Sequence, residues 1–294
     1  MAVKLPFVTL DVFTTTRYLG NPLAVVTLPS SDALDHDQLQ KIAAEFNLSE
    51  TVFIHPPSSP NSTTRRVQIF TTEAELPLAG HPLIGTATYL LKILKENVTQ
   101  FDTKGGPVPL HIDEVNGNVK AQIPQAFVIH KDYTFKSKLN DIDNPVVHLL
   151  PGMNFILVEL PSIEVLGKAG EEGNGSLTEK CFSPELYIGA DNKGGLIGTK
   201  YFTSTGKDES GRQKYRTRMI SFIEDAGTGS ACSALACWLA KRSGDGEWKY
   251  LFEQGVEMGR KNDISVDVNV KGGEIEKVVL SGAAVLVQEG TIQV

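Results

Sequence analysis

Two short segments of this 294-residue chain place glycine and a polar side chain directly before a run of small and apolar residues. The first is Ala79-Gly80-His81-Pro82, and the second is Asp225-Ala226-Gly227-Thr228-Gly229-Ser230. Each run predicts a buried helix, and the start of a helix presents backbone N–H groups that have no partner within the helix. Such groups bind small anions. Two helix starts facing each other would therefore form a cradle for a small anion such as a carboxylate.

The residues near the first segment suggest acid–base chemistry. Glu50 follows a predicted helix and opens a predicted strand. It is either a solvated charge at a strand edge or a general base, because partial burial raises the pKa of a glutamate toward neutrality. His81 either caps its helix or hydrogen-bonds a substrate hydroxyl or amine and relays protons. Gly80 would let a substrate approach the helix start closely.

The second segment is a weaker signal when taken alone. Asp225 is either a simple turn residue or a group that binds a substrate. The Gly227-Thr228-Gly229-Ser230 stretch is not a phosphate loop, because no Lys-Ser or Lys-Thr pair follows at the required place. An aspartate five residues before a serine, at the start of a buried helix, gains meaning only together with the first segment.

Composition and charge restrict the class of ligand. A net charge of −7 gives no general attraction to nucleic acid or to an anionic membrane, so an anionic ligand must be held by local donors. No run of 18 apolar residues and no secretory signal pattern is present, and we expect a soluble cytoplasmic protein. Cys181, Cys232 and Cys237 lack the spacing of a zinc site, and we expect small core residues in a reducing compartment. Neither metal nor nucleotide is expected.

Strand patterns dominate the chain. Runs rich in β-branched and aromatic residues predict strands at 8–13, 23–28, 51–55, 65–70, 108–112, 119–123, 153–160, 196–203, 215–223, 264–270 and 275–287. Helices are predicted after a Ser31-Asp32 cap, from His81 to about Asn97 with Pro82 as the first helical residue, and from Ser230 or Ala231 to Arg242. Pro124 and the polar residues 130–144 are interpreted as a crossing between domains, and 167–179 as a mobile surface loop. Each half thus offers several strands that can wrap around one buried helix.

Several segments in this order resemble the PhzF-type (phenazine biosynthesis isomerase-like) family, which is related in fold to diaminopimelate epimerase. The matching segments are Asp11-Val12-Phe13, Gly20-Asn21-Pro22-Leu23-Ala24-Val25-Val26, residues 47–54, Ile69-Phe70-Thr71, Glu75-Leu76-Pro77-Leu78-Ala79-Gly80-His81-Pro82, Glu224-Asp225 and Thr228-Gly229-Ser230-Ala231. They span most of the chain. Their shared order is specific, whereas no single segment is.

The resemblance implies an α+β fold of two similar domains, each a β-barrel-like sheet wrapped around a central helix. The expected domains are 1–127 with about 281–294, and 128–280, with the active site between the two helix starts. The resemblance further implies that Glu50 is the acid/base and that His81 and Asp225 position polar groups of the substrate. Ser230, with the backbone at Gly229 and Gly80, would bind the substrate. It also implies a homodimer.

We therefore predict a cofactor-independent isomerase that moves a proton on a small carboxylate-containing metabolite. An amino-acid epimerase or racemase, and a noncatalytic small-anion-binding protein of the same fold, are the alternatives. Two departures from the family pattern bear on the substrate: Ala226-Gly227 follow Asp225 where the family usually has proline, and the stretch 216–224 is shorter. A mechanism with two thiols is disfavoured, because His81 occupies the first helix start and Cys232 falls inside the second helix.

Overall fold

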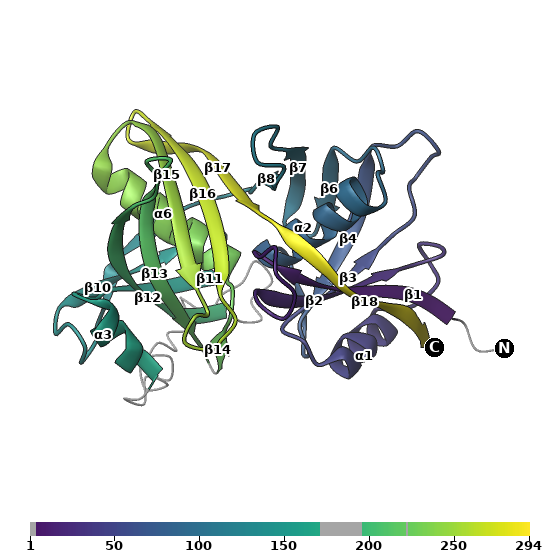
Figure 1. The fold of residues 1–294 in the computed structure, drawn as a ribbon, viewed down its shortest axis with the longest axis horizontal. Coiled ribbons are helices and arrows are strands. Elements are labelled where there is room, and N and C mark those ends of the chain that lie inside the picture. Colours follow the sequence, from purple (N-terminus) through teal and green to yellow (C-terminus); the bar gives the residue numbers. More distant parts are fainter. Residues whose placement is uncertain (1–3, 171–195, 222) are drawn as a thin grey trace. The chain divides into compact units, whose positions relative to one another are not determined.

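The computed structural model describes residues 4–170, 196–221 and 223–294, which divide into two compact units. The first unit comprises Met1–Pro124 and Leu280–Val294, and the second comprises Gln125–Val279. In each unit, strands surround one central helix, α2 in the first and α6 in the second (Figure 1). That these units fold as two separate domains with the bounds expected above stays a prediction.

The first unit is built mainly from strands. Its elements are β1 (Lys4–Val12), β2 (Asn21–Thr27), α1 (His36–Phe46), β3 (Thr51–Ile54), β4 (Thr64–Phe70), β5 (Glu75–Leu76), α2 (Gly80–Ala87), a π-helical turn (Thr88–Ile93), β6 (Gln100–Thr103), β7 (Gly106–Ile112), β8 (Val119–Gln122) and β18 (Ala284–Gln293). Within the first unit, α1 packs its Leu39, Ile42 and Ala43 against Phe53 and Phe70 of the sheet. The N-terminal strand β1 pairs with both β2 and the C-terminal β18. The two ends of the chain therefore close this unit.

The described part of the second unit is also built mainly from strands. Its elements are β9 (Val128–Lys136), β10 (Asp143–His148), β11 (Met153–Glu159), α3 (Ile163–Gly167), a 3₁₀ turn (Lys168–Gly170), β12 (Leu196–Lys207), β13 (Gln213–Ile220), β14 (Glu224–Asp225), α6 (Gly229–Ser243), β15 (Gly246–Gln254), β16 (Asn262–Lys271) and β17 (Glu274–Gly282), whose last three residues belong to the first unit. Of the described helices in the whole chain, none is long and apolar enough to cross a membrane.

The two units repeat one strand pattern. In the first, β2 pairs parallel with β3, β3 antiparallel with β4, and β4 parallel with β6. In the second, β11, β12, β13 and β15 repeat these three pairings in the same order. A two-residue strand, β5 or β14, then folds back on β4 or β13 and leads into the central helix. The helices α2 and α6 are therefore equivalent elements, and the strand register relates individual residues of the two units.

The central helices are buried because their side chains are small or apolar on nearly every face. Every residue of α2 is buried, as are the first nine residues of α6. Gly85 lets α2 lie close to the sheet: a Cβ there would come within 2.5 Å of Leu23 Cδ2 and 2.8 Å of Val12 Cγ2. A helix that is apolar all round is stable only inside a core. Helix α2 is thus held by direct packing on β1 and β2.

Several predicted boundaries were wrong. Helix α1 is capped by Asp35, whose side chain accepts from the backbone N–H of Gln38, and not by Ser31-Asp32. Helix α2 begins at Gly80 and is α-helical only to Ala87, so Pro82 is its third residue. Pro82 remains favourable there, because backbone N–H groups in the first turn have no helical partner.

The interpretation of 130–144 as a domain crossing was also wrong. Most of these residues belong to β9 and β10, which pair antiparallel within the second unit. Their polar side chains hid the strand pattern, since an edge of a sheet with a solvated face lacks a continuous apolar run. Residues 163–170, which overlap the start of the predicted mobile loop, are helical, whereas 171–179 and Cys181 lie outside the described residues. Cys232 and Cys237 are buried free thiols, as expected.

The close packing at Gly85 yields a test of the fold. We expect Gly85→Ala to lower the free energy of unfolding by about 1–3 kcal/mol, because the added methyl group forces Leu23 and Val12 to move. Gly167→Ala is the matched control, since a Cβ there meets no atom within 4 Å. Urea unfolding followed by circular dichroism measures both. Equal stability of the two variants would contradict the packing described for α2.

Candidate active site

Glu50 and His81 lie next to each other in the first unit. Asn47 ends α1 in the left-handed conformation (φ 50°), and the chain then turns so that Glu50 directly precedes β3. His81 is the second residue of α2. His81 Nε2 lies 3.5 Å from Glu50 Oε2, and the two side chains are 3% and 16% exposed. The pair is therefore nearly buried, while Glu50 keeps some access from outside.

Asn21 determines which nitrogen of His81 carries the proton. The Asn21 side-chain amide donates to His81 Nδ1 at 3.2 Å. A neutral imidazole has one N–H donor and one acceptor, so an Nδ1 that accepts leaves the proton on Nε2. That nitrogen is the one near the Glu50 carboxylate. The arrangement gives Glu50 and His81 the geometry of an acid–base pair that can hold and move a proton.

The start of α6 carries the second group of predicted residues. Thr228 is the N-cap residue, but its side chain makes no capping hydrogen bond. Instead its hydroxyl donates to Asp225 Oδ2 at 2.5 Å, and the backbone N–H of Gly227 donates to Asp225 Oδ1 at 3.4 Å. Gly229 and Ser230 follow as the first two helical residues, both buried. The Thr228 side chain thus does not cap the first turn of α6, and backbone N–H groups at a helix start can bind an anion.

The register of the repeat shows that the two units contribute different chemistry. Gly80 and Gly229 are the first residues of equivalent helices, and His81 and Ser230 are the second residues. In the β3–β4 and β12–β13 registers, the position of Glu50 corresponds to Gly198.

The aspartate also has no acidic counterpart. Asp225 ends β14, whereas Leu76 ends the equivalent β5. The first unit therefore supplies a carboxylate and an imidazole at its helix start. The second supplies a carboxylate and a hydroxyl.

The structure brings the six predicted residues together in two groups, one in each unit. Glu50, Gly80 and His81 form the first group, and Asp225, Gly229 and Ser230 form the second.

Sequence reasoning missed the roles of Asn21 and Thr228. For Asn21, the only sequence signal was the glycine beside it. The structure shows why a glycine stands there: Gly20 adopts φ +68°, and a Cβ would lie 2.2 Å from the carbonyl oxygen of Val12. The signal for Thr228 was its place directly before Gly229, where a threonine normally caps a helix.

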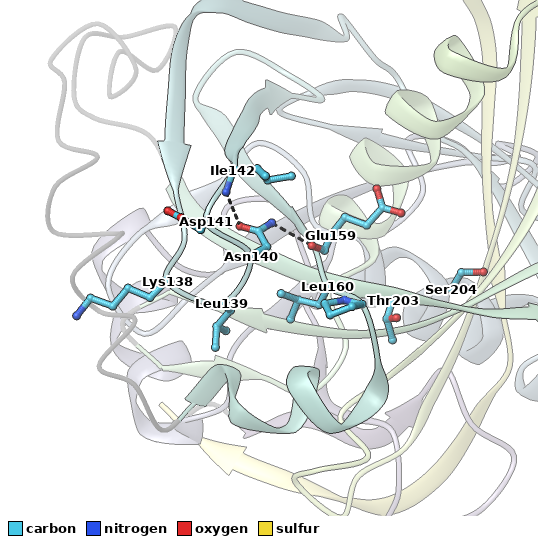
Figure 2. A pocket seen from close by; sticks show the side chains of 10 residues that line it. Lys138, Leu139, Asn140, Asp141, Ile142, Glu159, Leu160, Thr203 and Ser204 are labelled. Atoms are coloured by element: carbon cyan, nitrogen blue, oxygen red, sulfur yellow. Dashed lines mark hydrogen bonds between the residues drawn. The ribbon is translucent and has the colours of Figure 1, made fainter.

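A surface pocket in the second unit involves none of these six residues. Figure 2 shows its lining side chains, which come from three segments of the second unit. These are residues 138–142, Glu159 with Leu160 and Pro161, and Thr203 with Ser204. The Asn140 side chain accepts from the backbone N–H of Ile142 and donates to the carbonyl oxygen of Glu159, so it serves local structure (Figure 2). Among the described residues, no group of three or more His, Cys, Asp or Glu side chains is placed to hold a metal ion.

Comparisons with known proteins place this chain in a family. The model of the family described as phenazine biosynthesis-like protein (PhzC-PhzF) matches residues 10–290. The trans-2,3-dihydro-3-hydroxyanthranilate isomerase of Pseudomonas chlororaphis is 31% identical over 299 residues, which cover 97% of this chain and 98% of that protein.

Solved structures share the fold. A PhzF-family phenazine biosynthesis protein of Bacillus anthracis superposes with a TM-score of 0.76 at 23% identity, covering 99% of both chains. A hydroxyproline epimerase of Agrobacterium vitis, solved with bound trans-4-hydroxy-L-proline, superposes with a TM-score of 0.67 at 14% identity, covering 99% of this chain and 92% of that one. These likenesses confirm the predicted α+β fold of the diaminopimelate epimerase type. The chain belongs to the phenazine biosynthesis-like (PhzC-PhzF) family of isomerases.

Proposed function

We propose that this protein is a cofactor-independent isomerase that moves a proton on a small carboxylate-containing metabolite, with Glu50 as the general acid/base. The observation that supports this most directly is the placement of the Glu50 carboxylate beside the protonated Nε2 of His81, in a nearly buried site. A site that only binds an anion does not require the Glu50 carboxylate at that position. A proton-transfer site does, because a base must reach the C–H bond that breaks.

The reaction divides between the two groups of residues. Glu50 takes a proton from carbon and returns it at another carbon, which moves the double bond without a net change in charge. Negative charge develops on the substrate carboxylate during the transfer, and the first turn of α6, with the Ser230 hydroxyl, stabilises it. His81 and Asp225 bind the polar substituents of the substrate. Exclusion of water from the bound substrate would strengthen these electrostatic contacts.

The substrate class follows from the relatives. The substrate in the name of the Pseudomonas chlororaphis isomerase is an anthranilate, a carboxylate that also carries an amino group and a hydroxyl. Asp225 and His81 suit an amine and a hydroxyl, and the α6 start suits a carboxylate. We propose a substrate with this combination of groups, without assigning the phenazine precursor itself, since Ala226-Gly227 alter the chain beside Asp225. A cytoplasmic homodimer is proposed on family grounds.

Amino-acid epimerisation is the second candidate, because the hydroxyproline epimerase shares this fold. A two-thiol epimerase mechanism would need a cysteine at each helix start. The second residues of α2 and α6 are instead His81 and Ser230, and Cys232 is the fourth residue of α6. An epimerase of this chain would therefore use Glu50 and not a pair of thiols.

Replacing Glu50 by glutamine tests the proton transfer. We expect Glu50→Gln to lower turnover about 10²–10⁴-fold, because the amide occupies the same space but cannot accept the proton. The wild-type protein is first incubated in deuterated water with a panel of small amino and hydroxy carboxylates, and exchange is read by NMR and mass spectrometry. Exchange with double-bond migration indicates an isomerase, and exchange with inversion indicates an epimerase. Unchanged turnover of Glu50→Gln would overturn the assignment of the base.

Removing the Ser230 hydroxyl tests carboxylate binding at α6. We expect Ser230→Ala to raise KM about tenfold or more, because a hydrogen bond to a charged group is worth about 1.5–3 kcal/mol. Ser233→Ala is the control, since that buried hydroxyl donates to the Gly229 carbonyl within the helix. Steady-state kinetics on the substrate identified above measures both. A KM that rises for Ser233→Ala but not for Ser230→Ala would contradict binding at this end of α6.

A further inference from the structure

Lys200 is a fully buried lysine that the proposed reaction leaves unexplained. It lies in β12 with no exposed surface. Its ammonium donates to Gln254 Oε1 in a short contact and to Cys232 Sγ at 3.2 Å. Removing an ammonium group from water costs several kcal/mol unless charge and hydrogen bonds compensate. A fully buried lysine therefore indicates a compensating structural or functional role.

The first unit shows that the fold itself does not require this lysine. Val52 pairs with Ile69, and Lys200 pairs with Met219, at equivalent positions of the repeat. Cys232 is the fourth residue of α6, and the fourth residue of α2 is Leu83. The same place in the first unit is thus filled by two buried apolar side chains, Val52 and Leu83. The polar pair is specific to the unit that carries Asp225.

A chain of hydrogen bonds leads from Lys200 to Asp225. Gln254 Oε1 faces the ammonium, so its amide nitrogen points the other way and donates to the Asp225 carbonyl oxygen at 2.7 Å and to Thr228 Oγ1 at 3.0 Å. The Thr228 hydroxyl, having accepted from Gln254, donates to Asp225 Oδ2 at 2.5 Å. Gln254 Oε1 also accepts from the Thr228 backbone N–H at 3.3 Å.

The ammonium sets the direction of every bond in this chain. A lysine ammonium can only donate, whereas an amide and a hydroxyl can do both. Starting from a donor, each following group must accept from the one before and donate to the next, and the chain ends on a carboxylate oxygen that accepts. Burial lowers the pKa of Lys200 from its usual value, while the Cys232 thiol and Asp225 oppose that change. Asp225 is therefore coupled to Lys200 by charge as well as through Gln254 and Thr228.

We propose that Lys200 is a positioning residue that, through Gln254 and Thr228, fixes the orientation of the Asp225 carboxylate and of the turn entering α6. This inference rests on the proposed role of Asp225 in binding the substrate. By holding the Thr228 hydroxyl on Asp225, the chain also diverts it from capping α6. The start of the helix is thereby left open for the substrate carboxylate.

A double-mutant cycle separates positioning from a general structural effect. We expect Lys200→Met to lower kcat/KM about tenfold or more in the wild-type background, but less than about twofold in an Asp225→Asn background, since residues acting through one group are not additive. Cys237→Ala, a buried change elsewhere in α6, is the control and leaves kcat/KM unchanged. A loss of the same size in both backgrounds would overturn the inference.

Hydrogen exchange provides a readout that does not depend on activity. In Lys200→Met, the backbone amides of Gly227 and Thr228 should exchange faster than in Cys237→Ala, because the anchor of Gln254 is lost. Unchanged protection of these amides contradicts the inference whether or not the protein turns over a substrate. Absence of solvent exchange into every carboxylate tested with the wild-type protein would instead overturn the proposed function.

The repeat itself supplies a second variant in case Lys200→Met does not fold. Lys200→Val combined with Cys232→Leu installs the apolar pair of the first unit, and such replacements of buried polar groups are often neutral or stabilising. We expect this double variant to melt no lower than the wild type and to lose about tenfold or more in kcat/KM. A stable variant with full activity would show that Lys200 does not position Asp225.

Discussion

The burial of one helix start in each unit is the constraint on which the rest of the structure depends. A helix that begins inside a core must still satisfy the N–H groups of its first turn, because unpaired polar groups away from water are costly. Neither Ala79 nor Thr228 caps its helix with a side chain. The fold therefore maintains two polar sites within apolar surroundings. A small anion is the natural partner for such a site.

The repeated strand pattern positions these two sites in the same way but fills them with different side chains. In the first unit the polar groups are Glu50 and His81, with Asn21 setting the tautomer. In the second they are Asp225, Thr228 and Ser230. Gln254 donates hydrogen bonds to Asp225 and Thr228 and accepts one from Lys200. In the proposed reaction, Glu50 and His81 transfer the proton, and the start of α6 binds the substrate carboxylate. The two helix starts of this chain therefore carry different chemical groups.

Much of the candidate site could be proposed from sequence because its residues flank helix starts, and helix starts have a recognisable composition. Gly80, His81, Gly229 and Ser230 were found in this way. The boundaries of α1 and α2 were misjudged. The start of α1 did have a sequence signal, because Gln38 stands three residues after Asp35 and forms a capping box with it, whereas Ser31 and Asp32 have no such partner. Lys200 and Gln254 could not have been found, because 54 residues separate them in the chain and only the β12–β13–β15 pairing brings them together.

The central proposal is that Glu50 transfers the proton of a substrate whose carboxylate binds at the start of α6. A crystal structure of Glu50→Gln with the identified substrate tests it most directly, since that variant should bind without turning over. The account predicts the reacting carbon at about 3–3.5 Å from the side chain at position 50, and the carboxylate on Gly229 and Ser230. Substrate bound away from both, for example in the pocket beside Asn140, would contradict it.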